Sequence, residues 1–358
     1  MKGPSHLRRG WTTGACAAAA AKAAWQALLT GEFPDPVEIR LPGGQTPAFS
    51  LARQSLENGA AIAAIVKDAG DDPDVTHGAL VQVSVSRGPP GSGVAFRAGR
   101  GVGTVTRPGL PLPPGEPAIN PAPRKMIAAE IEAAAAACGE TGDAVVEVSI
   151  PGGEEVAKKT LNPRLGIVGG LSILGTTGVV VPYSCAAWIS GIHQGIDVAR
   201  AEGLMHIAGA TGSTSEAAVA ALYDLPEIAL IDMGDFAGGM LKYLRQHPVP
   251  RLTVAGGFAK MTKLGQGLLD LHSKRGSVDL GWLADCARDS GAGEETAARV
   301  RAANTGLEAL TICRASGIPI AGAVARRSLV TVEAVLEGSG IAVEVIVFDR
   351  EGHLVGRS

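Results

Sequence analysis

The pattern of hydrophobic and polar positions predicts different kinds of element in the two halves of the chain. Apolar and polar residues alternate over 80–87 and 144–151, which is typical of strands with one covered face. Two alanine-rich stretches, 15–29 and 124–139, favour helices because alanine has the highest helix propensity. Strands and helices mix here without a strict β-α-β order, so we predict an α+β architecture in two layers for the first half.

Short, continuously apolar runs dominate the second half. They are separated by helical patterns and cover 165–174, 205–212, 228–234 and 251–257. Such runs are expected for strands that are covered on both faces, and their alternation with helices predicts a mostly parallel, Rossmann-like sheet in three layers. The chain ends with the pattern of a β-hairpin over 341–358.

These patterns, with a length of 358 residues, predict about two domains. We expect an α+β domain over 1–162 and a Rossmann-like cofactor domain over 163–285. The remaining helices and the hairpin, 286–358, could belong to either domain. The overall fold class is therefore α/β plus α+β.

Composition narrows the classes of protein. Hydrophobic residues make up 46% of the chain but aromatic residues only 4%, so the core is expected to be small and aliphatic. The formal net charge is −3, which argues against nonspecific nucleic-acid binding. The segment 165–193 carries no charged residue, but its glycines and Pro182 argue against a membrane span.

The cysteines argue against a disulfide framework and a structural zinc site, because there are five of them, scattered and without a CxxC pair. The first residues lack the apolar core of a signal peptide. We therefore expect a cytoplasmic protein that needs no metal of its own.

Three unusual segments stand out. The Pro/Gly loop, 101–124, contains seven prolines, the acidic loop, 66–78, contains four aspartates followed by His77, and 150–178 is rich in glycine. Together with 11–24 and 271–279, these segments resemble the CbiD family, the cobalt-precorrin-5B C1-methyltransferases of cobalamin biosynthesis. The resemblance implies a two-domain enzyme that transfers a methyl group from S-adenosylmethionine to C1 of a corrin precursor, giving cobalt-precorrin-6A.

Two other functions remain open. A noncatalytic tetrapyrrole-binding or carrier protein would bind the corrinoid but not S-adenosylmethionine. A nucleotide-dependent enzyme could use 175–178 as a phosphate loop, but no GxxxxGK[ST] motif occurs in the chain. The partner is expected to be the small-molecule corrin precursor, with neither nucleic acid nor membrane. A homo-oligomer and transient contacts with other enzymes of the pathway are left open.

Cofactor-binding candidates lie where predicted strands end, since ligands of open parallel sheets bind beyond the carboxyl ends of the strands. The candidates are Gly175, Thr176, Thr177, Gly178, Gly209, Asp232 and Gly256. The glycines allow close approach of the backbone, and hydroxyl or carboxylate groups can bind ribose or the cofactor's amino-acid part. The alternative is that they form ordinary turns and caps.

Acid–base candidates come mainly from the acidic loop. They are Asp72, Asp74 and His77, with His272 as a weaker one, because imidazole titrates near neutral pH. A magnesium or calcium site is less favoured, since Pro73 interrupts the aspartates and the spacing is not that of an EF-hand. A solvated turn is the plain alternative.

Substrate-binding candidates are cationic, because the side chains of the corrin precursor carry many carboxylates. They are Arg107, Arg124, Lys158, Lys159, Arg164, Lys260 and Lys263. Each cluster could also be an ordinary solvated face. Since clefts between domains commonly hold ligands, we expect the active site at the domain junction.

Overall fold

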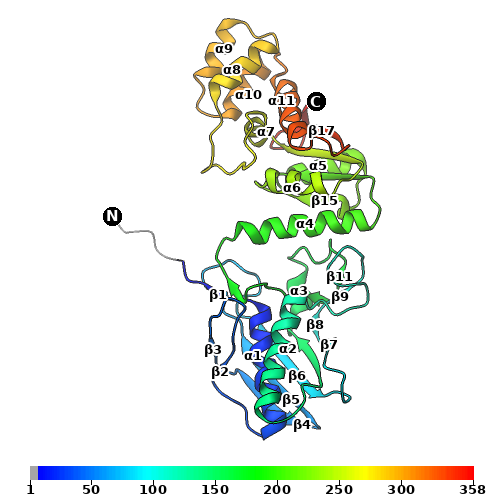
Figure 1. Cartoon of the computed structure of the whole chain (residues 1–358). Coiled ribbons are helices and arrows are strands. Elements are labelled where there is room, and N and C mark those ends of the chain that lie inside the picture. The colour runs from blue at the N-terminus through cyan, green and yellow to red at the C-terminus, as the bar shows by residue number, and fades with distance from the viewer. Residues whose placement is uncertain (1–6) are drawn as a thin grey trace, which may run out of the picture. The chain divides into compact units, whose positions relative to one another are not determined.

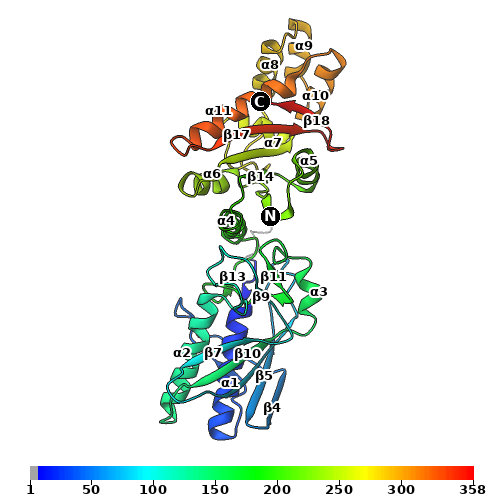
Figure 2. The ribbon, with the colours of Figure 1, turned by 90° about the vertical axis from the view of Figure 1, so that its right-hand side faces the viewer.

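The computed structural model describes residues 7–358 and divides the chain into two compact units (Figures 1 and 2). The first unit ends at Ser184, and the second runs from Cys185 to Ser358. The fold is mixed α/β with several sheets, one of which is five-stranded and mostly parallel. Within residues 7–358, every helix is too short or too polar to span a bilayer.

A five-stranded sheet covered by two helices forms the first unit. Its strand order is β4 (Arg53–Glu57), β5 (Ala60–Val66), β6 (Leu80–Arg87), β10 (Ala144–Ser149) and β7 (Val94–Ala98). Only the β10–β7 pair is parallel. The two alternating patterns are confirmed as β6 and β10, and β6 buries every second residue.

Helix α1 (Thr13–Thr30) lies beside α2 (Pro121–Ala137) and packs on this sheet (Figure 1). It begins at Thr12, whose side chain accepts a hydrogen bond from the Ala15 amide, and ends at Gly31 with φ of 85°. The alanines at 15, 17–21 and 23–24 are fully buried, so the small side chains let α1 lie close to the sheet and to α2.

Two-residue strands join the Pro/Gly loop to the glycine-rich segment. β8 (Gly101–Val102) pairs with β12 (Gly170–Leu171), and β9 (Thr104–Val105) pairs with β11 (Ile167–Val168). The prediction of one continuous strand over 165–174 in the parallel sheet is therefore wrong. Gly166 and Gly169 adopt φ of 70° and 89°, which interrupts the extended chain, and the short strands on either side of Gly169 pair with the Pro/Gly loop instead.

Smaller elements complete the first unit. They are β1 (Gly10–Trp11) paired with β13 (Val179–Val180), β2 (Val37–Glu38) paired with β3 (Ala48–Phe49), and the short helix α3 (Gly153–Ala157). The β1–β13 pair ties the end of the unit to the residues just before α1.

The mostly parallel sheet forms the centre of the second unit. Its strand order is β15 (Leu230–Asp232), β14 (His206–Ala210), β16 (Arg251–Gly257), β17 (Ala342–Phe348) and β18 (Leu354–Arg357). The first four strands are parallel and β18 is antiparallel. The hairpin predicted at the end of the chain is confirmed, and both of its strands join this sheet.

Helices surround the sheet, and Figure 2 shows α5 and α6 on opposite sides of it. They are α4 (Cys185–Ala201), α5 (Ser213–Tyr223), α6 (Ala237–Gln246), α7 (Phe258–Gly265), α8 (Leu280–Asp289), α9 (Glu294–Arg301), α10 (Gly306–Ala315) and α11 (Ile320–Val335), with a 3-10 turn at Glu227–Ala229. One large aliphatic core joins the sheet to the helices that follow it.

Candidate functional site

A pocket lies at the carboxyl ends of the parallel strands in the second unit. From β14 the chain passes through α5 to β15, and then through α6 back across β14 to β16. The direction of the crossovers therefore reverses between β14 and β16, and open α/β sheets bind ligands at such a switch point. We call the cavity found there, of about 390 Å³, the edge pocket.

The residues that line the edge pocket come from three strand ends and one helix. They are Thr211–Ser215 after β14, Gly257–Lys260 after β16, Phe348–Arg350 after β17, and Leu307 and Leu310 of α10. The lining thus combines hydroxyl groups, backbone amides and the charged residues Lys260, Asp349 and Arg350 with an apolar part.

Two helices begin at the edge pocket. Gly212 precedes α5 and Gly257 precedes α7, and neither helix start has a side-chain cap. The first amides of a helix carry partial positive charge and favour anions when no cap satisfies them. A Cβ atom at Gly212 or Gly257 would meet nothing within 4 Å. These two positions therefore leave open space at the pocket, while the serines and threonines between 211 and 215 supply hydroxyl groups.

Lys260 is the cationic side chain of α7 in the edge pocket, and it forms an ion pair with Asp235. Burial lowers its pKa, with a further contribution from Lys263. Lys263 itself is buried and donates to the Leu271 carbonyl at 3.0 Å, so its ammonium group holds the chain after α7. The two lysines proposed from sequence therefore occupy different surroundings.

Three predicted cofactor residues lie in the strands behind the edge pocket. Gly209, Asp232 and Gly256 belong to β14, β15 and β16 and do not line the cavity. A Cβ at Gly256 would lie 2.7 Å from Thr211 Oγ1, and one at Gly209 would lie 2.4 Å from Met240 Sδ. The two glycines thus allow close packing beneath the pocket.

The glycine-threonine turn, 175–178, lies instead in the first unit, against the start of α1. The Thr12 amide donates to the Gly178 carbonyl at 3.0 Å, and the Gly14 amide donates to the Leu174 carbonyl at 3.1 Å. Thr177 Oγ1 binds the backbone of Val179. Gly175, Thr176, Thr177 and Gly178 therefore do not follow a strand of the parallel sheet, which was the physical premise for placing the cofactor there.

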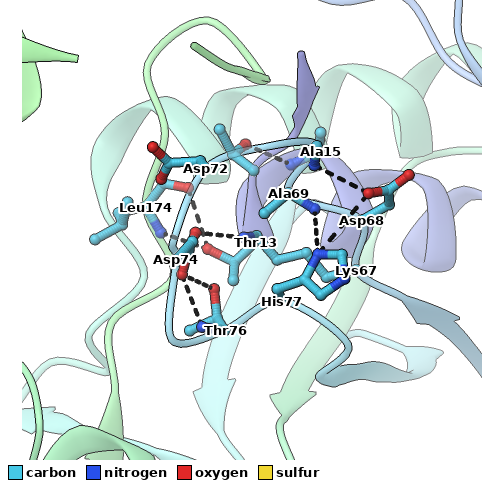
Figure 3. A network of polar contacts seen from close by, with 12 residues as sticks. Thr13, Ala15, Lys67, Asp68, Ala69, Asp72, Asp74, Thr76, His77 and Leu174 are labelled. Carbon is cyan, nitrogen blue, oxygen red and sulfur yellow. Dashed lines mark hydrogen bonds and ion pairs between the residues drawn. The ribbon is translucent and has the colours of Figure 1, made fainter. Parts of the chain in front are cut away.

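The acidic loop packs beside the same end of α1 (Figure 3). The ammonium group of Lys67 is buried and donates to Asp74 Oδ2 at 2.5 Å. Asp74 Oδ1 accepts from the amide and the hydroxyl of Thr76 at 2.7 and 2.6 Å. Burial acts to raise the pKa of Asp74, but the bonds from Lys67 and Thr76 outweigh it and lower the pKa. Asp74 thus anchors the loop.

The other candidates of the loop are also held. Asp72 Oδ1 accepts from the Tyr183 amide at 2.8 Å. The Nδ1 atom of His77 accepts from the Ala69 amide at 3.1 Å, and its ring is about half exposed (Figure 3). A hydrogen bond from Arg8 lowers the pKa of Asp68 to about 2. His272 lies on an exposed turn of the second unit, where its Nδ1 accepts from the Lys274 amide at 3.1 Å.

The structure brings two of the predicted basic clusters together. Thr106 binds the Gly166 carbonyl with its amide at 2.8 Å and its hydroxyl at 2.6 Å, and the side chain of Arg107 lies over Gly166. Arg107 is thus beside the segment that carries Lys159 and Arg164. Buried Asn162 holds this segment by donating to the Gly170 carbonyl at 3.1 Å.

Two other predicted cations have acidic partners. Arg124 donates to Glu116 at 2.8 Å and to the Ile119 and Pro117 carbonyls, which closes the Pro/Gly loop on the start of α2. Lys158 pairs with Glu155 at 2.7 Å on an exposed face. Both cations therefore contribute to local structure whatever else they bind.

Sequence reasoning missed Lys67, Asn162 and the hydroxyl residues 213–215. Nothing in the sequence singles out Lys67 or Asn162, because their roles come from tertiary contacts. The stretch 211–215, by contrast, reads TGSTS directly after an apolar run. Glycine and hydroxyl residues directly after an apolar run are the same pattern that favoured 175–178, so the sequence does indicate this site.

Known proteins of one family match this chain over nearly its whole length. The CbiD family model matches residues 1–182, and the model of the CbiD C-terminal domain matches residues 270–358. Proteins named cobalt-precorrin-5B C(1)-methyltransferase are 66% identical in Bradyrhizobium sp. (98% of this chain, 93% of the relative) and 62% identical in Methylorubrum extorquens (98% and 97%). That of Brucella anthropi is 60% identical, covering 99% and 96%.

One solved structure is also similar. It is a crystal structure of the cobalamin biosynthesis protein cbiD from Archaeoglobus fulgidus, 30% identical, with a TM-score of 0.41. The match covers 75% of this chain and 83% of that chain.

Proposed function

The chain belongs to the CbiD family and is a cobalt-precorrin-5B C(1)-methyltransferase of cobalamin biosynthesis, and on that premise we propose that its methyl donor is S-adenosylmethionine, bound in the edge pocket. Methylation of C1 of the ring gives cobalt-precorrin-6A. In this proposal the second unit is a Rossmann-like cofactor domain and the first unit supplies groups for the corrin precursor.

The position of the edge pocket is the observation that carries the proposal. It lies at the switch point of the sheet, where two uncapped helix starts meet. S-adenosylmethionine has a carboxylate, ribose hydroxyls and an adenine ring. The first amides of α5 and α7 suit the carboxylate, the hydroxyl groups of Ser213 and Thr214 suit polar contacts, and Leu307, Leu310 and Phe348 suit the adenine.

Methyl transfer from S-adenosylmethionine requires little of the protein beyond alignment of the two reactants. Bound S-adenosylmethionine would supply an activated methyl group, so the chain needs no nucleophile of its own. Its residues must hold donor and acceptor in line and exclude water, and good alignment contributes about 7–11 kcal/mol in favourable systems. Gly212 and Gly257 support this role because they let a ligand approach the backbone closely.

For the corrin precursor we propose the basic group around Gly166. Arg107 lies against this glycine, and Lys159 and Arg164 lie on the same segment. Guanidinium groups bind carboxylates with two parallel hydrogen bonds, which suits the acidic side chains of the ring. Arg124 and Lys158 are further candidates for binding the substrate, and each also pairs with a glutamate.

The acid–base roles also remain proposals. Asp72 Oδ2, His77 Nε2 and His272 Nε2 have no partner among residues 7–358, so each is available to a ligand. Both oxygens of Asp74 are occupied by Lys67 and Thr76, which favours an anchoring role for it. Asp232, Gly209 and Gly256 are proposed to shape the pocket from behind.

Calorimetric titration with S-adenosylhomocysteine tests the cofactor site. In Gly257→Leu the new side chain enters open space at the edge pocket, so binding should weaken at least about 100-fold by exclusion of the ligand. Gly293→Leu is the matched control, because Gly257 and Gly293 both precede a helix with φ of −69° and both have open space around them.

The results separate the competing functions. Loss of binding in Gly257→Leu alone supports the edge pocket. Loss in Thr177→Val with normal binding in Gly257→Leu would move the cofactor to the glycine-threonine turn. Absence of binding in the unaltered protein, with corrinoid affinity intact, would favour the tetrapyrrole carrier.

A further inference from the structure

The imidazole ring of His77 is held in one orientation. Its Nδ1 atom accepts a hydrogen bond from the Ala69 amide at 3.1 Å, within the same loop (Figure 3). The nearest acidic atom, Asp68 Oδ1, is 3.8 Å from Nδ1 and is itself bound by the Gly70 amide at 2.9 Å. The Ala69 amide therefore fixes Nδ1 as the ring nitrogen that bonds within the loop, and this leaves Nε2 on the other side of the ring.

This contact also determines where the proton of the ring lies. A backbone amide can only donate, so Nδ1 must offer a lone pair and cannot carry hydrogen. The neutral ring then has its hydrogen on Nε2. Nε2 has no partner among the residues that the structure describes, and the side chain is 53% exposed. His77 thus presents an N–H group outward.

The rest of the loop holds this arrangement in place. The Lys67 side chain is 1% exposed, and its ammonium group fixes Asp74. The Asp74 carbonyl accepts from the His77 amide at 2.9 Å, and the Lys67 carbonyl accepts from the Gly78 amide at 2.8 Å. The buried ion pair therefore fixes the backbone on both sides of His77.

Most of the charged groups around the ring have partners. Arg8 binds Asp68 with its guanidinium group and Asp71 with its amide, while Lys67 neutralises Asp74. Asp72 Oδ2 stays open as an acceptor, and the free hydrogen-bond donor of this cluster is Nε2–H of His77. Its natural partner is an oxygen atom, and the carboxylates of a corrin precursor are of that kind.

We infer that His77 binds a carboxylate of the substrate through Nε2–H and does not act as a general base, and that Lys67 and Asp74 are the positioning residues that keep it in this tautomer. The inference rests on the proposed function for the identity of the substrate. It deepens that proposal, because it replaces an acid–base role by a role in binding.

NMR spectroscopy of the ring nitrogens identifies the tautomer of His77 without any substrate. In protein labelled with ¹⁵N, long-range ¹H–¹⁵N correlation spectra distinguish a protonated nitrogen from an unprotonated one. The expected result is hydrogen on Nε2 of His77 in the unaltered protein, with the His77→Phe variant used to assign the signals. Hydrogen on Nδ1 would overturn the inference.

Steady-state kinetics test the role. Glutamine can place an N–H group near the position of Nε2, whereas phenylalanine cannot. His77→Gln should keep KM within about threefold, and His77→Phe should raise KM about 10-fold or more with little change in kcat, as for one lost hydrogen bond to a charged group. Val75→Ala, an exposed change in the same loop, is the control.

Two results would contradict the inference. A fall of about 100-fold or more in kcat for both histidine variants would indicate a general base. Unchanged KM and kcat in both would show that His77 does not contact the substrate. Binding of S-adenosylhomocysteine is measured beside each variant, so failure of the cofactor proposal is seen separately.

Discussion

Two short segments rich in glycine and hydroxyl groups, 175–178 and 211–215, have similar sequences and different surroundings. The first closes on the start of α1, and its Thr177 hydroxyl binds the backbone of Val179. The second follows β14 and begins α5 at the edge pocket, where no side chain caps the helix. The difference shows that composition marks a close turn, whereas the preceding strand decides whether the turn can bind a ligand.

The glycines of the two segments also differ in backbone conformation and in the space around them. Gly175 has φ of 117°, and a Cβ there would lie 2.4 Å from Thr12. Gly212 has φ of 164°, which is ordinary extended backbone, and open space around it. Gly175 is therefore required by packing and conformation, and Gly212 is required by neither. Open space that packing does not demand is consistent with a ligand-binding role.

The largest expected effect is on stability. Gly175→Val should reduce the free energy of unfolding by about 3 kcal/mol, because it adds backbone strain and a clash with Thr12. Gly212→Ala should change it by less than about 0.5 kcal/mol. Urea unfolding of the two variants measures both values, and equal losses would remove the contrast between the two turns.

A second effect concerns binding of S-adenosylhomocysteine. Thr214→Val removes a hydroxyl group from the edge pocket and should weaken binding about fivefold, as for one neutral hydrogen bond. Thr177→Val removes a hydroxyl group that serves the backbone and should leave the affinity unchanged. Calorimetric titration of both variants measures the two affinities. Weaker binding in Thr177→Val than in Thr214→Val would favour the glycine-threonine turn.

The smallest expected effect is the pH dependence of the first unit. Arg8 lowers the pKa of Asp68 to about 2 from its ordinary 3.8, so the stabilisation by Asp68 is present above pH 3.8 and is lost as the pH falls toward 2. The pair is exposed, and its contribution is therefore small. Asp68→Asn should unfold with a weaker dependence on pH between 4 and 2 than the unaltered protein. An identical dependence would exclude this role.

Much of the fold could be predicted from local patterns. The alternating strand over 80–87 corresponds to β6, and the apolar run over 251–257 corresponds to β16. The alanine-rich stretch forms α1. In each case one periodicity extends through the element, and local propensity agrees with the burial found in the structure.

The structure of the glycine-rich segment, 150–178, could not be predicted from local patterns. An apolar run over 165–174 resembles a buried strand, but glycines with positive φ interrupt it, and its partners, 101–105, lie about 60 residues earlier. Pairing between such distant segments leaves no periodic signal in the sequence. The same is true of Lys67, whose partner Asp74 is reached only through a turn of the acidic loop.

A crystal structure of the complex with S-adenosylhomocysteine would show where the cofactor binds. We expect the ligand at the edge pocket, with its carboxylate at the starts of α5 and α7 and its adenine near Leu307, Leu310 and Phe348. A ligand bound at 175–178, or anywhere away from 211–215 and 257–260, would contradict this expectation.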